Sequence, residues 1–326
     1  MDVLKDSFGR SFSYLRLSVT DACNFRCTYC LPNGYQGPDT EENVLSVKEI
    51  SFLAKAFAEL GFWKIRLTGG EPTVRRDIID IAQTVSSTPG IRAIALSTNA
   101  YRLKSLTRQL FEAGVRTINV SIDSLNPERF HQITGHNKLS DILEAIDLPL
   151  SLGMTLKVNV VLMKGVNDQE LPDFLRLAKT MPISVRFIEL MGTGCNRLIF
   201  EKRYFSGEVV KNQLENLGWI PKTKDEGSGP AINFKHPDYH GTVGIISPYS
   251  KDFCSTCNRL RITSRGALRL CLFSDGNLSL RHLLQHDDQR EEMKEMIRNI
   301  ILQKDVSHFL QKGRYGNAYN LAAMGG

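Results

Sequence analysis

The 326-residue chain lacks the features that would place it in a membrane or send it across one. It contains no run of about eighteen apolar residues, so we expect no membrane span. Residues 1–10 include acidic side chains and no apolar core, which argues against a secretory signal and against an acid-poor transit peptide. These absences predict a protein of the cytoplasm.

Aromatic residues are scarce, at 8% of the chain, and they are not interleaved with the basic residues. Proteins that hold single-stranded nucleic acid stack its bases on aromatic side chains set in a basic groove. We therefore expect no nucleic-acid partner. The formal net charge of +6 is modest and favours an anionic substrate.

Each of two cysteine groups lacks a fourth cysteine. The first has the order Cys-x₃-Cys-x₂-Cys and the second Cys-x₂-Cys-x₁₃-Cys: Cys23, Cys27 and Cys30, then Cys254, Cys257 and Cys271. A structural zinc site normally takes four protein ligands. Three thiolates instead leave one iron of a cubane [4Fe–4S] cluster without a protein ligand, and that iron can bind a small molecule.

The cysteine pattern predicts two separate clusters, each with one open corner. Two alternatives stay open, namely one metal site shared by all six thiolates and a zinc knuckle at each end. The seventh cysteine, Cys195, lies outside both groups and is either an inert small side chain or a substrate contact. Thiols in a chain without an export signal indicate a reducing compartment.

Strand-like and helical segments alternate over the first two thirds of the chain with a spacing of roughly thirty residues. The predicted strands are 14–20, 64–68, 91–97, 117–122, 156–162 and 184–190, and the predicted helices are 47–60, 77–86, 103–113, 140–152 and 170–180. Such alternation predicts an α/β fold with parallel strands and right-handed crossovers. About six βα units are fewer than the eight of a closed TIM barrel, so we expect an open, partial TIM-type barrel.

The pattern changes after residue 192. A helix is expected at 207–217, a loop at 227–230 and a strand at 243–246, followed by a hairpin of strands 260–263 and 267–272 and a charged helix at 287–302. We therefore expect two regions. Residues 1–192 form the partial barrel with the first cluster, and residues 193–326 form a smaller α+β extension that carries the second cluster and binds substrate.

Polar residues follow the predicted strands at the end where the active site of a parallel barrel lies. Gly69 and Gly70 have no Cβ, so their backbone can approach a ligand and donate N–H groups to it. Lys157 interrupts an apolar strand, where its charge is costly to bury unless it meets an anion. Arg259 and Arg261 are two apart on a predicted strand and so share a face, and arginine suits phosphate.

These residues carry a family resemblance. The first cysteine motif with Tyr29 before its third cysteine, followed by Gly-Gly-Glu-Pro at 69–72, resembles the radical S-adenosylmethionine (SAM) superfamily. The second cysteine group and the terminal Gly325 and Gly326 make the chain similar, over essentially its whole length, to the GTP 3′,8-cyclase family of molybdenum cofactor biosynthesis. The resemblance implies a lyase that converts GTP to 3′,8-cyclo-7,8-dihydro-GTP, with SAM and two [4Fe–4S] clusters as cofactors.

The resemblance also implies roles for individual residues. The SAM contacts would be Tyr29, Gly70, Ser121 and Met191. The GTP contacts would be Arg16, Arg66, Ser97, Lys157, Arg259, Leu260 and Arg261. Catalysis would depend on Arg259, Arg261, Gly325 and Gly326. The sequence departs from the family pattern at Ala100, usually glycine, and at 193–196, where Cys195 replaces an acidic residue.

Partners follow from the same resemblance. We expect a reductant such as a flavodoxin-type electron donor, a downstream cyclic pyranopterin monophosphate synthase, and a homodimer. Two other functions remain open on the sequence. One is a radical SAM enzyme whose auxiliary cluster serves a peptide substrate, although the basic residues favour a polyanion. The other is a non-enzymatic, metal-bound nucleic-acid-binding module.

Overall fold

A computed structural model describes residues 3–37, 44–223, 229–316 and 321–322. The strands of this part are β1 (Tyr14–Ser18), β2 (Lys64–Thr68), β3 (Ala93–Thr98), β4 (Thr117–Ser121), β5 (Thr155–Leu162), β6 (Ser184–Glu189), β7 (Ile220–Lys222), β8 (Ile232–Lys235), β9 (Thr242–Ile246), β10 (Arg259–Ile262), β11 (Ala267–Arg269) and β12 (Leu278–Ser279). They form a single sheet in the order β12-β11-β10-β1-β2-β3-β4-β5-β6-β9-β8-β7. The order has two free ends, so the barrel is open, as the sequence predicts.

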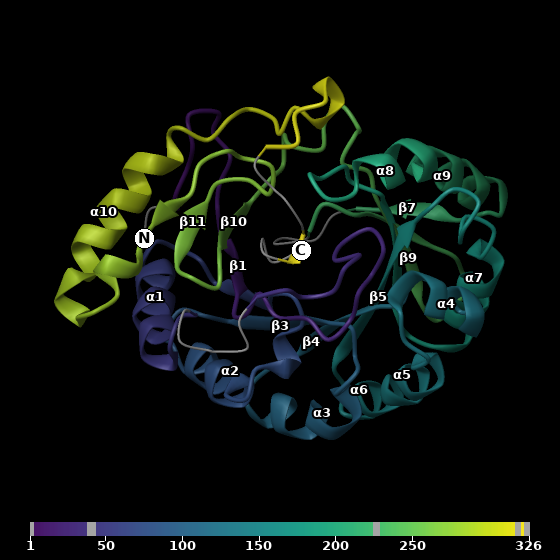
Figure 1. The fold of residues 1–326 in the computed structure, drawn as a ribbon, viewed down its shortest axis with the longest axis horizontal. Helices are drawn as coiled ribbons and strands as arrows, with labels where there is room; N and C mark the ends of the chain where they lie inside the picture. Colours follow the sequence, from purple (N-terminus) through teal and green to yellow (C-terminus); the bar gives the residue numbers. More distant parts are fainter. Residues whose placement is uncertain (1–2, 38–43, 224–228, 317–320, 323–326) are drawn as a thin grey trace.

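The helices lie outside the curved sheet (Figure 1). They are α1 (Val47–Glu59), α2 (Ile78–Ser86), α3 (Leu103–Glu112), α4 (Pro127–Thr134), α5 (Leu139–Ala145), α6 (Asp147–Ser151), α7 (Leu171–Thr180), α8 (Arg197–Arg203), α9 (Gly207–Asn216) and α10 (Arg290–Ile301). Four 3-10 helices, Pro72–Val74, Arg281–Leu283, Asp287–Gln289 and Leu310–Lys312, complete the described elements. Among these segments no helix has the length and apolar character needed to cross a bilayer.

The first six strands pair in parallel in chain order, which confirms the predicted βα units. The sheet also contains two parallel strands from the second half of the chain, because β10 pairs with β1 and β9 pairs with β6. Hairpins extend both ends, with β11 and β12 beyond β10 and β8 and β7 beyond β9. Strands separated by more than two hundred residues in the sequence therefore stand side by side.

Two helical segments differ from the sequence expectation. The predicted helix 140–152 is divided into α5 and α6, because Pro149 has no N–H to bond back to the turn before it. Helix α4 was not predicted, although its signals are present. Asn126 caps it by accepting a hydrogen bond from the Arg129 N–H, Pro127 starts it, and Gly135 ends it at φ +77°.

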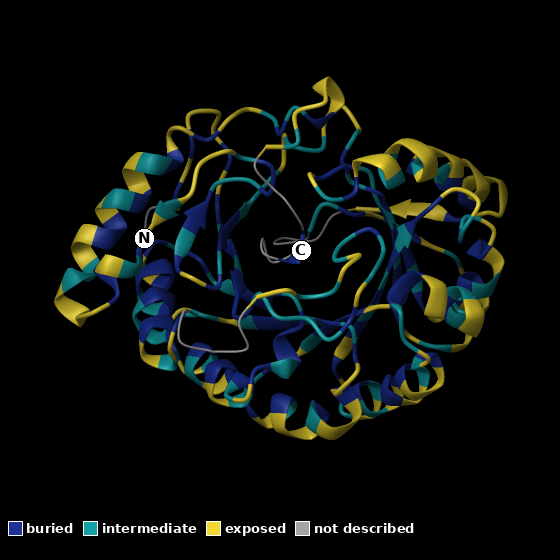
Figure 2. Cartoon of the chain, in the orientation of Figure 1, coloured by how far each residue is buried: buried dark blue, intermediate teal, exposed yellow. Residues whose placement is uncertain are grey.

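The apolar core lies between the sheet and its outer helices. Figure 2 shows buried residues along the strands and on the helix sides that face them, with exposed residues on the outer sides. Ser46 and Glu49 form a capping box that fixes the start of α1 against this core. Since the core occupies the outer face of the sheet, side chains on the inner face are available for a site.

Candidate active site

A cavity of about 490 Å³ occupies the inner face of the sheet and the carboxyl ends of its strands. All six cysteines of the two groups line this one cavity. The first group comes from the loop after β1, and the second from the segments before β10 and after β11. The fold thus brings together two ligand groups that the sequence separates by more than two hundred residues.

The first cysteine group forms one end of the cavity with the four residues that the resemblance links to SAM. Tyr29, Gly70, Ser121 and Met191 all line it. Burial raises the pKa of the Cys23 thiol to about 11 and that of Cys30 to about 12. Metal ligation needs thiolates, so loading this end with a cluster must release protons.

The Gly-Gly-Glu-Pro loop is packed against the first cysteine loop. A Cβ on Gly70 would lie 2.3 Å from the Ala22 carbonyl oxygen, so only glycine fits there. The Gly70 N–H donates to the Thr20 carbonyl at 3.0 Å. This differs from the sequence expectation that the Gly70 N–H points to a ligand, because the cysteine loop takes that hydrogen bond.

Glu71 connects this loop to the end of β3. Its Oε1 accepts hydrogen bonds from the Thr73 N–H at 3.0 Å, the Thr73 hydroxyl at 2.6 Å and the Thr98 hydroxyl at 2.7 Å. Its Oε2 accepts one from the Asn99 N–H at 2.5 Å. Burial raises the pKa of Glu71, and these four donors oppose that rise. The carboxylate is therefore a structural link between two strand ends.

The second cysteine group forms another part of the cavity wall beside basic residues. Burial acts to raise the pKa of Cys257, but Arg259, Lys304 and Arg10 outweigh it and lower that pKa to about 7. The Arg259 guanidinium lies 3.9 Å from the Cys257 sulfur. Arg10 also donates to the Cys254 carbonyl at 3.2 Å, which fixes this loop to the N-terminal segment.

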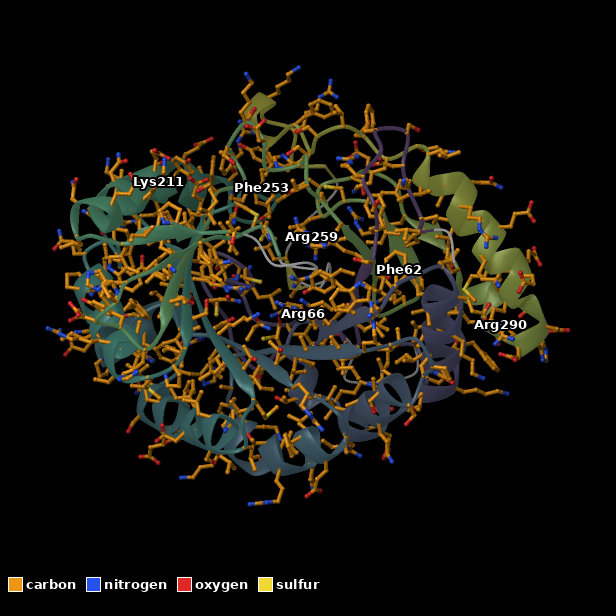
Figure 3. The ribbon with its side chains drawn as sticks, turned by 180° about the vertical axis from the view of Figure 1, so that it is seen from behind. Phe62, Arg66, Lys211, Phe253, Arg259 and Arg290 are labelled. Carbon is orange, nitrogen blue, oxygen red and sulfur yellow. The ribbon has the colours of Figure 1, made fainter. Side chains whose placement is uncertain are left out.

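Among the described residues, seven lysine and arginine side chains and one carboxylate, Asp123, line the cavity. The basic side chains are Arg16, Lys64, Arg66, Lys157, Arg186, Arg259 and Arg261. Strand register explains their convergence. Arg16 of β1 stands between Arg66 of β2 and Arg261 of β10, so three arginines lie in one row across neighbouring strands. Figure 3 shows Arg66 and Arg259 in the middle of the molecule, with Lys211 and Arg290 near its outer edge.

Cations gathered in one cavity repel one another, and an anionic ligand relieves that repulsion. Burial and the nearby Arg186, Arg66 and Lys64 lower the pKa of Lys157 to about 7. Burial and Arg66 likewise lower the pKa of Arg186 to about 10. The Nε atoms of Arg66 and Arg186 and the Tyr14 hydroxyl are buried and have no hydrogen-bond partner within the described residues. This wall of the cavity therefore offers charged groups and hydrogen-bond donors that suit a ligand with several anionic oxygens.

Sequence reasoning missed Lys64, Arg186 and Tyr14 as cavity residues. Alternation of side chains along a strand could have identified two of them. Lys64 is two residues from Arg66, and Tyr14 is two from Arg16, so each pair shares the inner face of its strand. Arg186 stands between Val185 and Phe187, which are both buried in the core. A cation in such a strand faces inward, as Lys157 does.

One predicted residue among those the structure describes stands apart from the cavity. Leu260 does not line it, because its side chain is fully buried in the core on the opposite face of β10 from Arg259 and Arg261. Gly325 and Gly326 lie outside the described residues. Cys195 is half-buried next to the first cysteine loop, with its sulfur 3.4 Å from the Cys30 carbonyl oxygen.

The donor set of each cysteine group fits an iron–sulfur cluster better than a single ion. No three Cys, His, Asp or Glu side chains in the described segments are placed to hold one metal ion. A zinc ion needs its ligand atoms at about 2.0–2.3 Å from one point. A cubane takes its thiolates at three different irons, so the sulfurs stand further apart.

Comparisons with known proteins show which families the chain resembles. Residues 17–178 match the model of the radical SAM superfamily, and residues 183–310 match that of Molybdenum Cofactor Synthesis C. A Streptococcus suis SuiB structure bound to S-adenosylmethionine has a TM-score of 0.60 at 13% identity, and the match covers 87% of this chain and 68% of that one. That likeness concerns the fold.

Fold and family match together define a radical SAM enzyme, a class that uses a [4Fe–4S] cluster and SAM. The chain is 51% identical to the GTP 3′,8-cyclase of Vibrio atlanticus (strain LGP32) over 325 residues, which cover 99% of this chain and 97% of the relative. It is 48% identical to the GTP 3′,8-cyclase of Yersinia pestis over 324 residues, which cover 99% of each. The chain belongs to the GTP 3′,8-cyclase family.

Proposed function

We propose that the protein converts GTP to 3′,8-cyclo-7,8-dihydro-GTP, the first step of molybdenum cofactor biosynthesis. The observation that carries this proposal is the cavity itself, where seven basic side chains lie in one chamber with both cysteine groups. A triphosphate supplies about four negative charges, and arginine offers paired, permanently charged donors for phosphate oxygens. A peptide substrate would bring fewer negative charges to this group of cations than a triphosphate does.

The second cluster is part of the proposal. Cys254, Cys257 and Cys271 would hold it, and its open iron would bind the guanine. The basic residues of β1, β2, β5, β6 and β10 would bind the triphosphate and fix the ribose between the two ends of the cavity. When bound, SAM at a reduced cluster would supply the one-electron chemistry that takes H3′ from GTP, and closing the C3′–C8 bond would take one further electron and one proton from the reductant and solvent.

The protein's own contribution is orientation and exclusion of water. Ser97 at the end of β3 accepts a hydrogen bond from the Arg66 guanidinium at 3.4 Å. The two would together face the ribose and phosphates of GTP. The cavity lies on the inner face of the sheet, where charge interactions are stronger than in bulk water. Holding C3′ and C8 in place supplies much of the rate of ring closure.

Several partners belong to this proposal. Six of the seven cysteines would be cluster ligands, and a reducing compartment such as the cytoplasm would keep them out of disulfides. We propose a flavodoxin-type reductant as electron donor and a cyclic pyranopterin monophosphate synthase as the consumer of the product. We also propose a homodimer and retain the division into residues 1–192 and 193–326. The diglycine end, Gly325 and Gly326, would assist Arg259 and Arg261 in turnover.

The test is an anaerobic reaction of the reconstituted, reduced protein with SAM and GTP. We expect equal formation of 5′-deoxyadenosine and cyclised product by mass spectrometry, with deuterium from [3′-²H]GTP in the 5′-deoxyadenosine. Formation of 5′-deoxyadenosine without transferred deuterium would contradict the proposal. Turnover of a peptide substrate without turnover of GTP would also contradict it.

A further inference from the structure

Tyr29 lies in the first cysteine loop between Cys27 and Cys30 and is held by two hydrogen bonds at its two ends. Its hydroxyl donates to Asp123 Oδ2 at 2.7 Å. Its carbonyl oxygen accepts from Asn196 Nδ2 at 2.9 Å. Asp123 and Asn196 are 3% and 1% exposed, so water does not replace either bond. The cysteine loop is thus fixed by two buried polar side chains from elsewhere in the fold.

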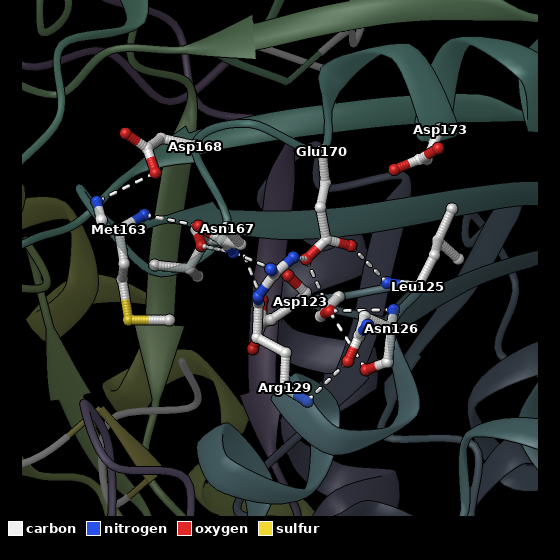
Figure 4. A network of polar contacts seen from close by, with 12 residues as sticks. Asp123, Leu125, Asn126, Arg129, Met163, Asn167, Asp168, Glu170 and Asp173 are labelled. Atoms are coloured by element: carbon white, nitrogen blue, oxygen red, sulfur yellow. Dashed lines mark hydrogen bonds and ion pairs between the residues drawn. The ribbon is translucent and has the colours of Figure 1, made fainter.

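Asp123 is itself held from both sides, as Figure 4 shows. Its Oδ1 accepts from the Val161 N–H of β5 at 2.8 Å. Its carbonyl oxygen accepts from Asn167 Nδ2 at 2.6 Å, and the same amide donates to the Val161 carbonyl at 2.8 Å. Asn167 Oδ1 accepts from the Met163 N–H at 2.7 Å. The end of β5 therefore determines where the Asp123 carboxylate stands.

The turn that follows Asp123 is fixed by Glu170. This carboxylate accepts from the Ser124 hydroxyl at 2.6 Å, from the Leu125 N–H at 2.7 Å and from the Arg129 guanidinium at 2.5 Å. The segment from β4 into α4 is thereby attached to the start of α7. Asp123 is consequently positioned by the scaffold, and the cysteine loop is positioned by Asp123.

Asn196 makes the second connection. Its Nδ2 donates to the Met191 carbonyl at 3.0 Å as well as to Tyr29, and its Oδ1 accepts from the Thr193 N–H at 2.8 Å. Because both carbonyls need a donor and the N–H needs an acceptor, one amide orientation serves all three groups. Asn196 thus joins the cysteine loop to the segment after β6, where the sequence departs from the family pattern.

We infer that Asp123 and Asn196 are positioning residues for SAM. They link the three segments that carry Tyr29, Ser121 and Met191, all of which line the SAM end of the cavity. Neither residue needs to touch SAM for this role. The inference rests on SAM binding at the first cysteine group and makes no use of GTP.

Asp123→Asn tests the first link with little change in shape. Asp123 serves two donors, the Val161 N–H and the Tyr29 hydroxyl, with two oxygens, whereas an asparagine has one oxygen. One buried donor then has no partner while the cysteine loop keeps its SAM-binding position, and that cost corresponds to a roughly tenfold to hundredfold change in affinity. We expect this loss in SAM affinity, measured anaerobically on the cluster-loaded protein. Iron content should stay within about twofold of the parent, and GTP affinity should not fall.

Tyr29→Phe removes the same hydrogen bond by deleting its donor. The double variant Asp123→Asn with Tyr29→Phe should therefore lose no more SAM affinity than the single variant with the larger loss. Asn196→Ala should also weaken SAM binding. Glu49→Gln is the matched control, because Glu49 is a buried carboxylate in the capping box of α1 and does not line the cavity. It should leave SAM affinity unchanged.

Unchanged SAM affinity in Asp123→Asn and Asn196→Ala would overturn the inference. Additive losses in the double variant would overturn it too, and so would a parallel fall in iron content and GTP affinity, which is the mark of a general structural role. If Asp123→Asn does not fold, Tyr29→Phe tests the same hydrogen bond, and unchanged SAM affinity in that variant would overturn the inference. Failure of GTP cyclisation by the parent protein would count against the proposed function alone, because SAM binding is measured without GTP.

Discussion

The pKa of Lys157 gives a prediction that depends on the charge environment of the cavity. Burial, Arg186, Arg66 and Lys64 lower this pKa to about 7. An incoming triphosphate reverses the repulsion and favours the charged amine, so GTP binding should be coupled to uptake of a proton. Because the charged form is the one that binds, affinity should be highest below pH 7 and should fall as pH rises above it.

The magnitude follows from the charged fraction of Lys157 in the free protein. With a pKa of about 7, that fraction falls from about nine-tenths at pH 6 to about one-tenth at pH 8. Apparent affinity scales with the binding-competent fraction, so the Kd for GTP should rise about tenfold over this range. The terminal phosphate of GTP gains charge above about pH 6, which acts in the opposite direction and needs a control.

Lys157→Arg provides that control, because arginine stays charged over the whole range. Equilibrium dialysis of radiolabelled GTP at pH 6, 7 and 8 measures both proteins at constant ionic strength. We expect the ratio of the parent Kd to the variant Kd to rise about tenfold from pH 6 to pH 8. A ratio that does not change with pH would show that Lys157 is not near the triphosphate or is already charged, and would refute the reasoning.

Three further outcomes follow from the site. Arg186→Met should weaken GTP binding roughly tenfold to hundredfold with SAM binding unchanged, and equal loss of both ligands in dialysis would contradict a phosphate role. Cys271→Ser should retain about four of about eight irons and still bind SAM, whereas Cys27→Ser should lose SAM binding; iron analysis with SAM titration distinguishes them. Deletion of Gly325 and Gly326 should leave both clusters and GTP binding intact but stop cyclisation, and normal product formation by mass spectrometry would refute that role.

The sequence predicts the six central strands closely because each is an apolar run followed by turn residues. Ser184–Glu189, for example, lies within the predicted strand 184–190. It does not predict that β9 and β10 join the same sheet in parallel, since both are short and neither is part of a βα repeat. Such pairings depend on the shape of the folded sheet and have no local signal.

The same division holds at the site. The six cysteines stand out in the sequence because metal-ligand spacing is a local property. The inner-face residues Lys64 and Arg186 do not stand out in the sequence, because a cation in a strand is equally consistent with a solvated edge position. Only the curvature of the folded sheet shows that they line the cavity. Glu71 and Asp123 face side chains from distant segments, so their roles emerge only when those segments are placed in space.

The central claim is that one chamber presents two open irons, the first to SAM and the second to GTP. The most direct measurement is electron–nuclear double resonance on the anaerobically reconstituted, reduced protein, with ¹⁷O-carboxylate SAM and ¹⁵N-guanine GTP added separately. We predict hyperfine coupling from each label, and we predict that Cys271→Ser abolishes the guanine coupling while it preserves the SAM coupling. Coupling of both labels to the same cluster, or guanine coupling that survives in Cys271→Ser, would contradict the claim.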